Sequence, residues 1–194
     1  MKKDVKKGLL EMLGATFLWG SVPLMGIYSN LPSGVFVFFR VLFAFPFIFY
    51  FAIKRAGIKE FFNLKPFWPL LLSGVMLGVN WVFFFLAVKM TEVSTAVTIY
   101  YAGPVISMFL AALFLKEKLT KWIILGALLA FLGVIISVKG NINADIGSLM
   151  ALFAAISYAL LGFFSKIAIM YHRAVSVTAW QILISIFITS PFLF

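Results

Sequence analysis

The chain of 194 residues contains no cysteine and few charged side chains. The absence of cysteine excludes disulfide bonds and thiolate catalysis, although it does not identify a cellular compartment. Charged residues make up 11% of the sequence, against about 25% in an ordinary soluble domain. The six acidic residues and one histidine are scattered among the termini and polar breaks, with no HExxH, DxxxD or Ser–His arrangement. We therefore predict that the protein is not an enzyme and carries no metal or cofactor.

Apolar residues are abundant instead, at 64% of the chain, with a mean hydropathy of +1.12. A helix needs about 20 apolar residues to cross the hydrocarbon of a bilayer. The sequence predicts an all-α membrane protein that crosses the lipid bilayer repeatedly. Division at charges and turn residues predicts seven transmembrane helices, over residues 9–28, 34–53, 67–88, 93–115, 121–138, 147–170 and 174–194.

The basic residues lie in the short breaks between these spans. Thirteen Lys and Arg residues lie on the side of the N-terminus and two on the other, leaving Arg40 within the second span. This bias predicts a cytoplasmic N-terminus in the plasma membrane. The net charge of +10 is explained by topology and anionic lipid headgroups, so we predict no binding of nucleic acid. The opening "MKKDVKKGLL" resembles a signal peptide, but the long apolar run after it predicts a retained span.

An internal similarity relates the two ends of the chain. At an offset of 139 residues Gly8 aligns with Gly147 and Trp19 with Tyr158, and at nearly the same offset Arg40 aligns with Gln181. A unit of five spans would place the second copy in the opposite orientation, as in the inverted repeats of many transporters. We predict a first repeat over residues 1–139 and an incomplete second repeat over 140–194. The last span ends without a polar flank, so we expect a truncated chain and a complete protein of ten helices.

Three stretches carry a family resemblance: "LWGSVP" in the first span, "FFRVLFAF" in the second, and "TAVTIYYAGPVISMFLAALFLKEKLTKWIILGALLAFLGVIIS" across the fourth and fifth. They resemble the EamA branch of the drug/metabolite transporter superfamily, most specifically in the mid-helix Pro104 and the "LFLKEKLT" hairpin with Glu117. The resemblance implies a ten-helix transporter with a central cavity between two five-helix repeats. It implies export or uptake of small organic molecules such as amino acids.

The fourth span is interrupted at residues 100–104. Pro104 has no N–H, so the carbonyl of Tyr100 loses its helical partner, which in lipid must be replaced by protein or water. Thr98 and Tyr101, together with Ser94, are expected to form one hydroxyl-bearing face. We predict that Thr98, Tyr100 and Tyr101 bind substrate on the wall of a wet cavity. The alternative is a structural kink whose tyrosines bond neighbouring helices.

The first span carries a similar interruption, because Pro23 frees the carbonyl of Trp19. Trp19 and its repeat counterpart Tyr158 both lie near mid-span, where two aromatic rings could hold a substrate between them. Core packing is the alternative for Trp19. Asn80 near the centre of the third span is either a substrate ligand or a hydrogen bond between helices. We predict Trp19, Asn80 and Tyr158 as further substrate-binding residues and Pro23 and Pro104 as helix kinks.

Arg40 is the costliest residue in the sequence, since an Arg at mid-membrane costs roughly 2.5–3.5 kcal/mol on insertion scales. No acidic residue of this chain lies at the same depth to neutralise it. We predict that Arg40 takes part in gating or attracts an anionic group. A structural or snorkelling role is the alternative.

Four other features receive structural interpretations. Glu117 is expected to pair with the lysines beside it, and Thr120 to cap the next helix. His172 lies in a loop and is expected to be exposed. Gly126 and Gly133 belong to a stripe of small residues that predicts a helix-packing face in the fifth span.

Together these features predict a secondary transporter that moves a small organic metabolite, an amino acid or a similar compound, by alternating access. Two alternatives stay open: a nucleotide-sugar or sugar-phosphate carrier of the same superfamily, and a nonfunctional truncated fragment. The four-helix small multidrug exporters fit poorly, because they depend on a mid-helix Glu in the first span, and this chain has no Glu at such a position. The expected partners are the substrate and the bilayer, and the sequence gives no sign of an oligomer.

Overall fold

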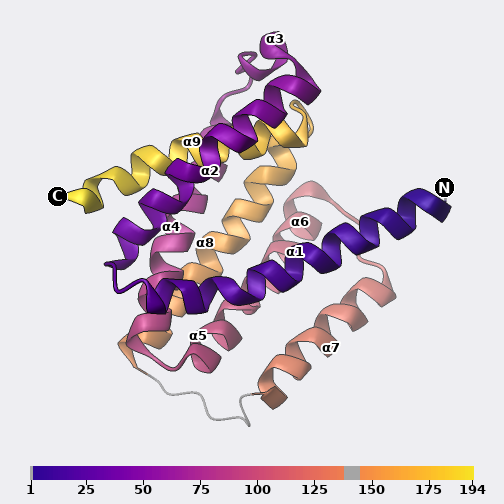
Figure 1. Cartoon of the computed structure of the whole chain (residues 1–194). Coiled ribbons are helices and arrows are strands. Elements are labelled where there is room, and N and C mark those ends of the chain that lie inside the picture. The colour runs from indigo at the N-terminus through magenta and orange to yellow at the C-terminus, as the bar shows by residue number, and fades with distance from the viewer. Residues whose placement is uncertain (1, 138–144) are drawn as a thin grey trace.

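The computed structural model describes residues 2–137 and 145–194, and these ranges contain helices and no strand (Figure 1). The helices are α1 (Lys2–Tyr28), α2 (Ser33–Ala56), α3 (Ile58–Phe61), α4 (Trp68–Met90), α5 (Val93–Tyr100), α6 (Ala102–Leu115), α7 (Lys121–Ser137), α8 (Ile146–Ala168), α9 (Ala174–Thr189) and the 3-10 helix η1 (Ser190–Leu193).

Six segments of the described ranges are long and apolar enough to cross a bilayer: Gly8–Tyr28, Ser33–Ala56, Trp68–Met90, Val93–Leu115, Ile146–Ala168 and Ala174–Leu193. They correspond to six of the seven predicted spans. The predicted span 121–138 forms α7, a helix of 17 residues, which is shorter than the roughly 20 residues that a crossing needs. The structure therefore confirms an all-helical chain with six candidate spans and does not confirm a seventh.

The central helix is α4, which packs along α8 on one side and α9 on another. Small residues allow this close approach. A Cβ added at Gly74 would lie 2.6 Å from the Cβ of Ile184 in α9, so only glycine fits there. The Ser185 hydroxyl of α9 also donates a hydrogen bond to the Gly74 carbonyl at 3.1 Å. These contacts fix the position of α9 against α4, the central helix of the bundle.

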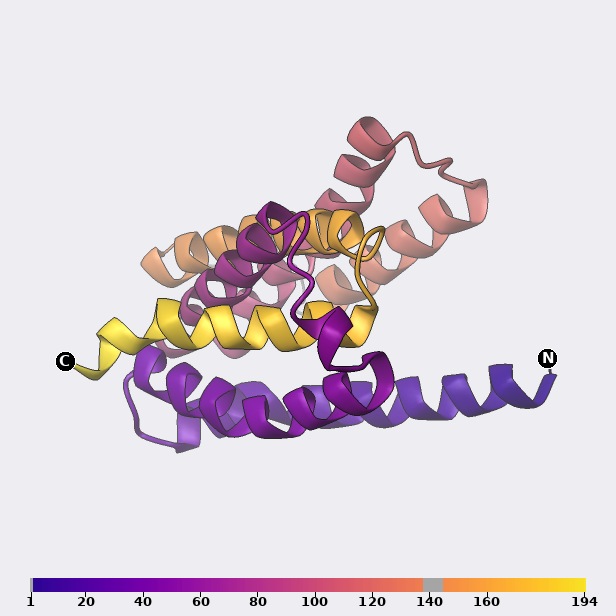
Figure 2. The same ribbon diagram turned by 90° about the horizontal axis from the view of Figure 1, so that it is seen from above.

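Two helices, α1 and α7, lie at the periphery of the bundle, on different sides of α4 and α8 (Figures 1 and 2). Most apolar side chains of α1 are exposed, Phe17 to 83%. The stripe of small residues in α7, which includes Gly126 and Gly133, was predicted to be a helix-packing face, but no described helix packs on it. A Cβ added at Gly126 or Gly133 would meet no atom within 4 Å, because no described helix lies against that face.

The short helix α3 caps the start of α9. The N-cap residue of α9, Arg173, provides no side-chain cap. Glu60 takes its place, accepting hydrogen bonds from the Arg173 N–H at 3.0 Å and from the Ser176 hydroxyl. A carboxylate at a helix N-terminus compensates the unpaired N–H groups and the helix dipole. The carboxylate thus joins the segment after α2 to the α8–α9 hairpin.

The aromatic rings beside this cap reinforce the same junction. The Trp180 indole of α9 donates to the Phe61 carbonyl at 2.9 Å, and the two rings stack with centroids 5.2 Å apart. His172, predicted to be exposed, is buried, and its Nε2 lies 3.2 Å from the Pro66 carbonyl oxygen. The prediction was wrong because the segment between α3 and α4 folds over the α8–α9 turn.

Glu117, just after α6, forms an ion pair with Lys166 of α8. The expected pairing with the neighbouring lysines of its own hairpin is thus replaced by a bond to a residue far along the chain. Thr120 accepts a hydrogen bond from the Ile123 N–H at 3.4 Å, in the position of an N-cap of α7 as predicted.

Asp145 provides a side-chain cap at the start of α8, accepting a hydrogen bond from the Ser148 N–H at 2.7 Å. The Thr91 hydroxyl and this N–H stabilise the carboxylate and lower the pKa of Asp145. Replacing the cap by Asp145→Ala should lower the thermal stability of the folded state at neutral pH, because the Ser148 N–H loses its side-chain partner. Thermal unfolding of the detergent-solubilised chain would measure this loss.

The cap should also respond to pH. A carboxyl with a lowered pKa stabilises the fold above its unfolded-state pKa, and this contribution disappears as the pH falls through the folded-state value. The difference between the native chain and Asp145→Ala should therefore shrink in acid, and Asp145→Asn should retain most of the stability at neutral pH. An equal difference at every pH would contradict the role of the carboxylate.

Candidate functional site

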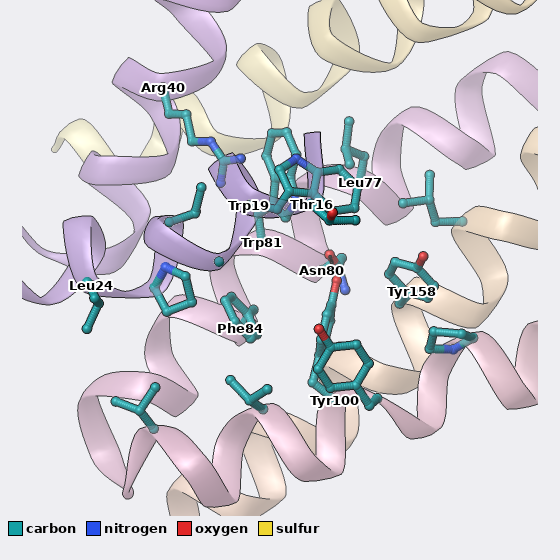
Figure 3. Close-up of a pocket in the computed structure, with 18 residues that line it drawn as sticks. Thr16, Trp19, Leu24, Arg40, Leu77, Asn80, Trp81, Phe84, Tyr100 and Tyr158 are labelled. Atoms are coloured by element: carbon teal, nitrogen blue, oxygen red, sulfur yellow. Dashed lines mark hydrogen bonds between the residues drawn. The ribbon is translucent and has the colours of Figure 1, made fainter. Parts of the chain in front are cut away.

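A cavity of about 470 Å³ lies among α1, α2, α4, α8 and the junction of α5 with α6 (Figure 3). Its wall is largely apolar and includes six aromatic side chains, and most of the labelled side chains of Figure 3 converge on it from these different helices. The lining residues are Thr16, Trp19, Gly20, Val22, Pro23, Leu24, Arg40, Leu77, Asn80, Trp81, Phe84, Val93, Val97, Tyr100, Tyr101, Pro104, Tyr158 and Leu161.

The break in the fourth span shapes one wall of this cavity. The helix α5 ends at Tyr100, and α6 begins at Ala102, with Tyr101 between them. Gly103 allows the second half to lie against α8, because a Cβ added there would be 2.8 Å from the Ala155 carbonyl oxygen. The interruption predicted from Pro104 is therefore present. By contrast, α1 continues through Pro23 as one helix.

Tyr100 is the centre of an aromatic cluster in this wall. Its ring centroid lies 4.6 Å from that of Phe84 and 5.4 Å from that of Tyr158. The ring centroid of Tyr101, the residue at the helix break, lies 6.4 Å from that of Tyr100. Such tilted and edge-to-face pairs contribute about 0.5–1.5 kcal/mol beyond their buried area. They hold three tyrosines from two helices in a fixed arrangement at the cavity.

Asn80 bridges the helices behind these rings. Its Nδ2 donates to the Ala154 carbonyl of α8 at 2.7 Å, and its Oδ1 accepts a hydrogen bond from the Tyr100 hydroxyl at 3.2 Å. The side chain is fully buried. Of the two roles left open by the sequence, the structure shows the interhelical hydrogen bond. The amide lies on the cavity wall with its oxygen and nitrogen both engaged by protein.

Arg40 is the single charged residue in the lining. Its guanidinium carbon lies 4.3 Å from the ring centroid of Trp81 and 5.9 Å from that of Phe85. A guanidinium over an aromatic face gains about 2 kcal/mol or more when the pair is desolvated. Within residues 2–137 and 145–194, no carboxylate forms an ion pair with Arg40. The aromatic faces therefore offset part of the desolvation cost of the guanidinium, but no negative charge neutralises it.

The cavity brings together most of the residues predicted as a site. Of the six predicted substrate-binding residues, Thr98 alone is absent from the lining. Thr98 is buried, and its hydroxyl donates to the Ser94 carbonyl at 2.7 Å. Ser94 and Tyr101 are exposed whereas Thr98 is buried, so the three residues do not form one accessible hydroxyl-bearing face. Pro23, Pro104 and Arg40 also line the cavity.

Several lining residues were not predicted from the sequence. Leu77, Trp81 and Phe84 flank Asn80 at spacings that place all four on one face of α4. The sequence contains a signal for them: residues three or four positions before and after Asn80 lie on the same face of a helix as this mid-membrane amide. Gln181, the repeat counterpart of Arg40, does not line the cavity and donates instead to the Ser165 hydroxyl at 2.8 Å.

The chemistry available at the cavity is limited to binding groups. The lining offers one cation, tyrosine and threonine hydroxyls and aromatic faces, and it contains no carboxylate or imidazole. Among the described residues, no group of three or more His, Asp or Glu side chains could hold a metal ion. The arrangement can accept an apolar, aromatic or anionic molecule without covalent chemistry.

Comparison with known proteins identifies related sequences. The EamA-like transporter family matches residues 6–139. Two Bacillus subtilis (strain 168) proteins are similar: the uncharacterized transporter YxxF, 28% identical over 171 residues (84% of this chain and 55% of the relative), and the uncharacterized transporter YojE, 30% identical over 173 residues (84% and 56%). The protein RarD of Escherichia coli (strain K12) is 27% identical over 174 residues (84% and 56%). The chain spans about half the length of these relatives. No solved structure matches it.

The Asn80 bridge can be tested by truncation. Asn80→Ala leaves the Ala154 carbonyl and the Tyr100 hydroxyl without this partner in a buried position, so it should destabilise the fold by about 1–3 kcal/mol. Ser73→Ala is the matched control, since Ser73 is equally buried on α4 but bonds only the Leu70 carbonyl of its own helix. Thermal unfolding of both variants in the same detergent compares them. Equal losses would contradict a special role for the bridge.

The close approach at the helix break gives a second prediction. Gly103→Ala should destabilise the chain, because its Cβ would collide with the Ala155 carbonyl oxygen and press on the Tyr158 ring. Gly126→Ala, which meets no atom within 4 Å, should be neutral or stabilise α7 by up to about 1 kcal/mol through helix propensity. Circular dichroism during heating measures both, and the opposite ranking would refute the described packing.

Proposed function

Because the chain belongs to the EamA-like transporter family, we propose that it is the N-terminal portion of a secondary transporter whose cargo occupies the cavity around Tyr100 and Tyr158. The cargo is a small organic metabolite, an amino acid or a similar compound. The observation that best supports this proposal is the composition of the cavity wall. Its residues come from α1, α2, α4, α5 and α6 within residues 1–139 and from α8 within residues 140–194.

The cavity wall contains residues from both proposed repeats, which supports a binding site at the interface between the repeats. Trp19 of α1 and Tyr158 of α8 hold equivalent positions in the proposed repeats 1–139 and 140–194, and both line the cavity. In transporters built from inverted repeats, the cargo lies at the repeat interface near the middle of the membrane. The complete protein is proposed to contain ten transmembrane helices, consistent with relatives about twice as long as the matched segment.

The proposed mechanism is alternating access, in which the two five-helix units rock around this site. The junction of α5 and α6 at Tyr101 provides a discontinuous helix beside the cargo. Pro104 and Pro23 leave carbonyl groups of the cavity-lining helices without helical partners. These carbonyls and the hydroxyls of Tyr101 and Tyr158 are proposed to hydrogen bond the cargo or the water that replaces it.

The charge at the site favours one class of cargo over another. Arg40 is proposed to attract an anionic group, such as a carboxylate, to a wall that otherwise carries no charge. Recognition of phosphate usually employs several cationic groups or bidentate arginine contacts, and the described lining supplies one cation. A carboxylate-bearing metabolite is therefore preferred over the nucleotide sugar or sugar phosphate of related carriers.

The family match and the apolar helices show a multi-pass membrane protein of a transporter family. The names of the relatives likewise denote transporters rather than enzymes. We place the protein in the plasma membrane with its N-terminus in the cytoplasm, on the strength of the thirteen basic residues on one side of the spans against two on the other.

The absence of cysteine from the chain permits a direct test of the cavity. Single substitutions Trp19→Cys, Tyr101→Cys and Tyr158→Cys should react with a small hydrophilic thiol reagent in membranes, because water reaches these positions. Ser73→Cys, in the dry core, and Leu113→Cys, at an exposed apolar position of α6, are the matched controls and should stay unlabelled. Mass spectrometry of the intact chain quantifies the reaction.

Substrate protection then identifies cargo. Amino acids and other small carboxylates added before the reagent should slow labelling of Tyr158→Cys if they occupy the cavity. If the three cavity cysteines react no more than the Ser73→Cys and Leu113→Cys controls, the assignment of this cavity as the transport site is refuted. That result would also favour the alternative that the chain is a nonfunctional fragment.

A further inference from the structure

The hydrogen bonds of Asn80 have a fixed direction. The Ala154 carbonyl can only accept a hydrogen bond, so the amide atom 2.7 Å from it must be the donating Nδ2. The opposite orientation of the amide would bring two acceptor oxygens together. The Oδ1 atom therefore faces the Tyr100 hydroxyl at 3.2 Å, and the hydrogen of this second bond must come from Tyr100.

This direction determines what the Tyr100 hydroxyl can offer a ligand. A tyrosine hydroxyl has one proton to donate, and its oxygen can also accept hydrogen bonds. The proton of Tyr100 is engaged by Asn80, so a ligand finds only the acceptor positions of the oxygen. Both residues line the central cavity, and Figure 3 shows their side chains approaching each other in its wall. Tyr100 thus presents the cavity with a hydrogen-bond acceptor.

The aromatic rings around this oxygen favour a positively charged donor. The ring centroids of Phe84 and Tyr158 lie 4.6 Å and 5.4 Å from that of Tyr100, and all three residues line the cavity. The faces of such rings attract cations. An ammonium group can therefore donate a hydrogen bond to the Tyr100 oxygen while it contacts aromatic rings. A carboxylate in the same place would meet an acceptor and be repelled.

Arg40 has the opposite character, because a guanidinium can only donate hydrogen bonds. Its carbon lies 4.3 Å from the ring centroid of Trp81, and Trp81 directly follows Asn80 in α4. The cation and the acceptor oxygen are therefore both held by adjacent residues of the central helix. Figure 3 shows the pair of Arg40 and Trp81 above the pair of Asn80 and Tyr100. The cavity wall thus has two binding groups of opposite polarity in a fixed arrangement.

From this polarity we infer that the Tyr100 oxygen binds an ammonium group of the cargo, with Asn80 as the positioning residue that fixes the hydroxyl, while Arg40 receives the carboxylate. The cargo class is then a zwitterionic amino carboxylate, bound at both charged groups, and not a simple carboxylic acid. The inference rests on the proposed transporter function and adds to it the residue that distinguishes the two kinds of acid.

The test compares ligands that share a carbon skeleton and differ in one charged group. The first set is leucine, 4-methylpentanoate, which lacks the ammonium, and leucinamide, which lacks the carboxylate. Alanine and phenylalanine, each with the same two derivatives, extend the test to a smaller and an aromatic side chain. The measurements are made at about pH 6.5, below the ordinary pKa of an α-amino group, so that the amines carry their charge.

Binding is measured as protection of a cysteine in the cavity. The whole chain carrying Trp19→Cys is labelled in membranes with a small hydrophilic thiol reagent, and mass spectrometry gives the ligand concentration that halves the labelling rate. In at least one of the three sets, the amino acid should protect at a concentration about tenfold or more below that of either derivative, because each derivative loses one hydrogen bond to a charged group.

Variants in the same cysteine background separate the two binding groups. Tyr100→Phe keeps the ring and removes the acceptor, so it should reduce the preference for the amino acid over the deaminated acid roughly ten- to hundredfold. Arg40→Gln should instead reduce the preference for the amino acid over the amino amide. Tyr50→Phe removes a hydroxyl from an exposed residue of α2 that does not line the cavity. It is the matched control and should keep both preferences.

Asn80→Ala tests whether the amide fixes the direction of the bond. Without the amide, the Tyr100 proton is free, and the hydroxyl can donate to a carboxylate as well as accept from an ammonium. The preference for the amino acid over the deaminated acid should therefore decrease. A purely structural role of Asn80 would weaken protection by both ligands equally. If Asn80→Ala or Tyr100→Phe does not fold, the comparison of the three ligands on the otherwise native chain still decides.

Three results would overturn the inference: no preference for the amino acid in any of the three sets, an unchanged preference in Tyr100→Phe, or an equal loss in Tyr50→Phe. These results differ from a failure of the transporter proposal. If Trp19→Cys reacts with the reagent and is protected best by the deaminated acids, only the present inference is wrong. If Trp19→Cys does not react at all, water does not reach the cavity and both proposals are wrong.

Discussion

The buried contact between α4 and α8 determines where the rest of the molecule can lie. Asn80 connects the two helices by a hydrogen bond to the Ala154 carbonyl and also receives the Tyr100 hydroxyl. In an apolar surrounding, an unsatisfied amide is costly, so the relative position of these helices is constrained by the geometry of one side chain. The glycines on the other side of α4 then allow α9 to approach closely. Small residues and one amide thus set how closely the central helices approach one another.

This scaffold has a direct consequence for the cavity. Because Asn80 holds Tyr100 from behind, the Tyr100 ring is fixed against Phe84 and Tyr158. The helix break at Tyr101 then lies beside the ring cluster, where Gly103 lets α6 pack on α8. The kink and the aromatic wall are therefore parts of one arrangement. Tyr100 fits both interpretations of the interrupted helix. Its hydroxyl bonds a neighbouring helix through Asn80, and its ring lines the cavity.

Arg40 places a positive charge in an apolar part of the protein, which is energetically unfavourable. Its guanidinium lies on Trp81 in the wall of the central cavity. Aromatic faces lower the cost of burying the cation but do not neutralise it. An arginine in this state favours a negatively charged ligand in the cavity.

The sequence by itself determined the features that depend on local composition. Apolar runs separated by short polar breaks predicted six of the described spans, since membrane insertion depends on the hydrophobicity of each segment. The loss of an N–H at Pro104 predicted the interruption near Tyr101, which is a covalent property of proline. The positions of Trp19, Tyr100, Tyr101 and Tyr158 near mid-span marked the region that lines the cavity.

Only the tertiary structure decided which neighbours each side chain meets. Thr98 is buried, whereas Tyr101, three residues further along the chain, is exposed to 48% and lines the cavity. Glu117 pairs with Lys166, and His172 is buried beside Pro66, through contacts with residues far along the chain. Gly103 is essential for packing and Gly126 is not, although both are glycines in apolar helices. In these cases the decisive partner lies on another helix, and local sequence contains no information about its distance.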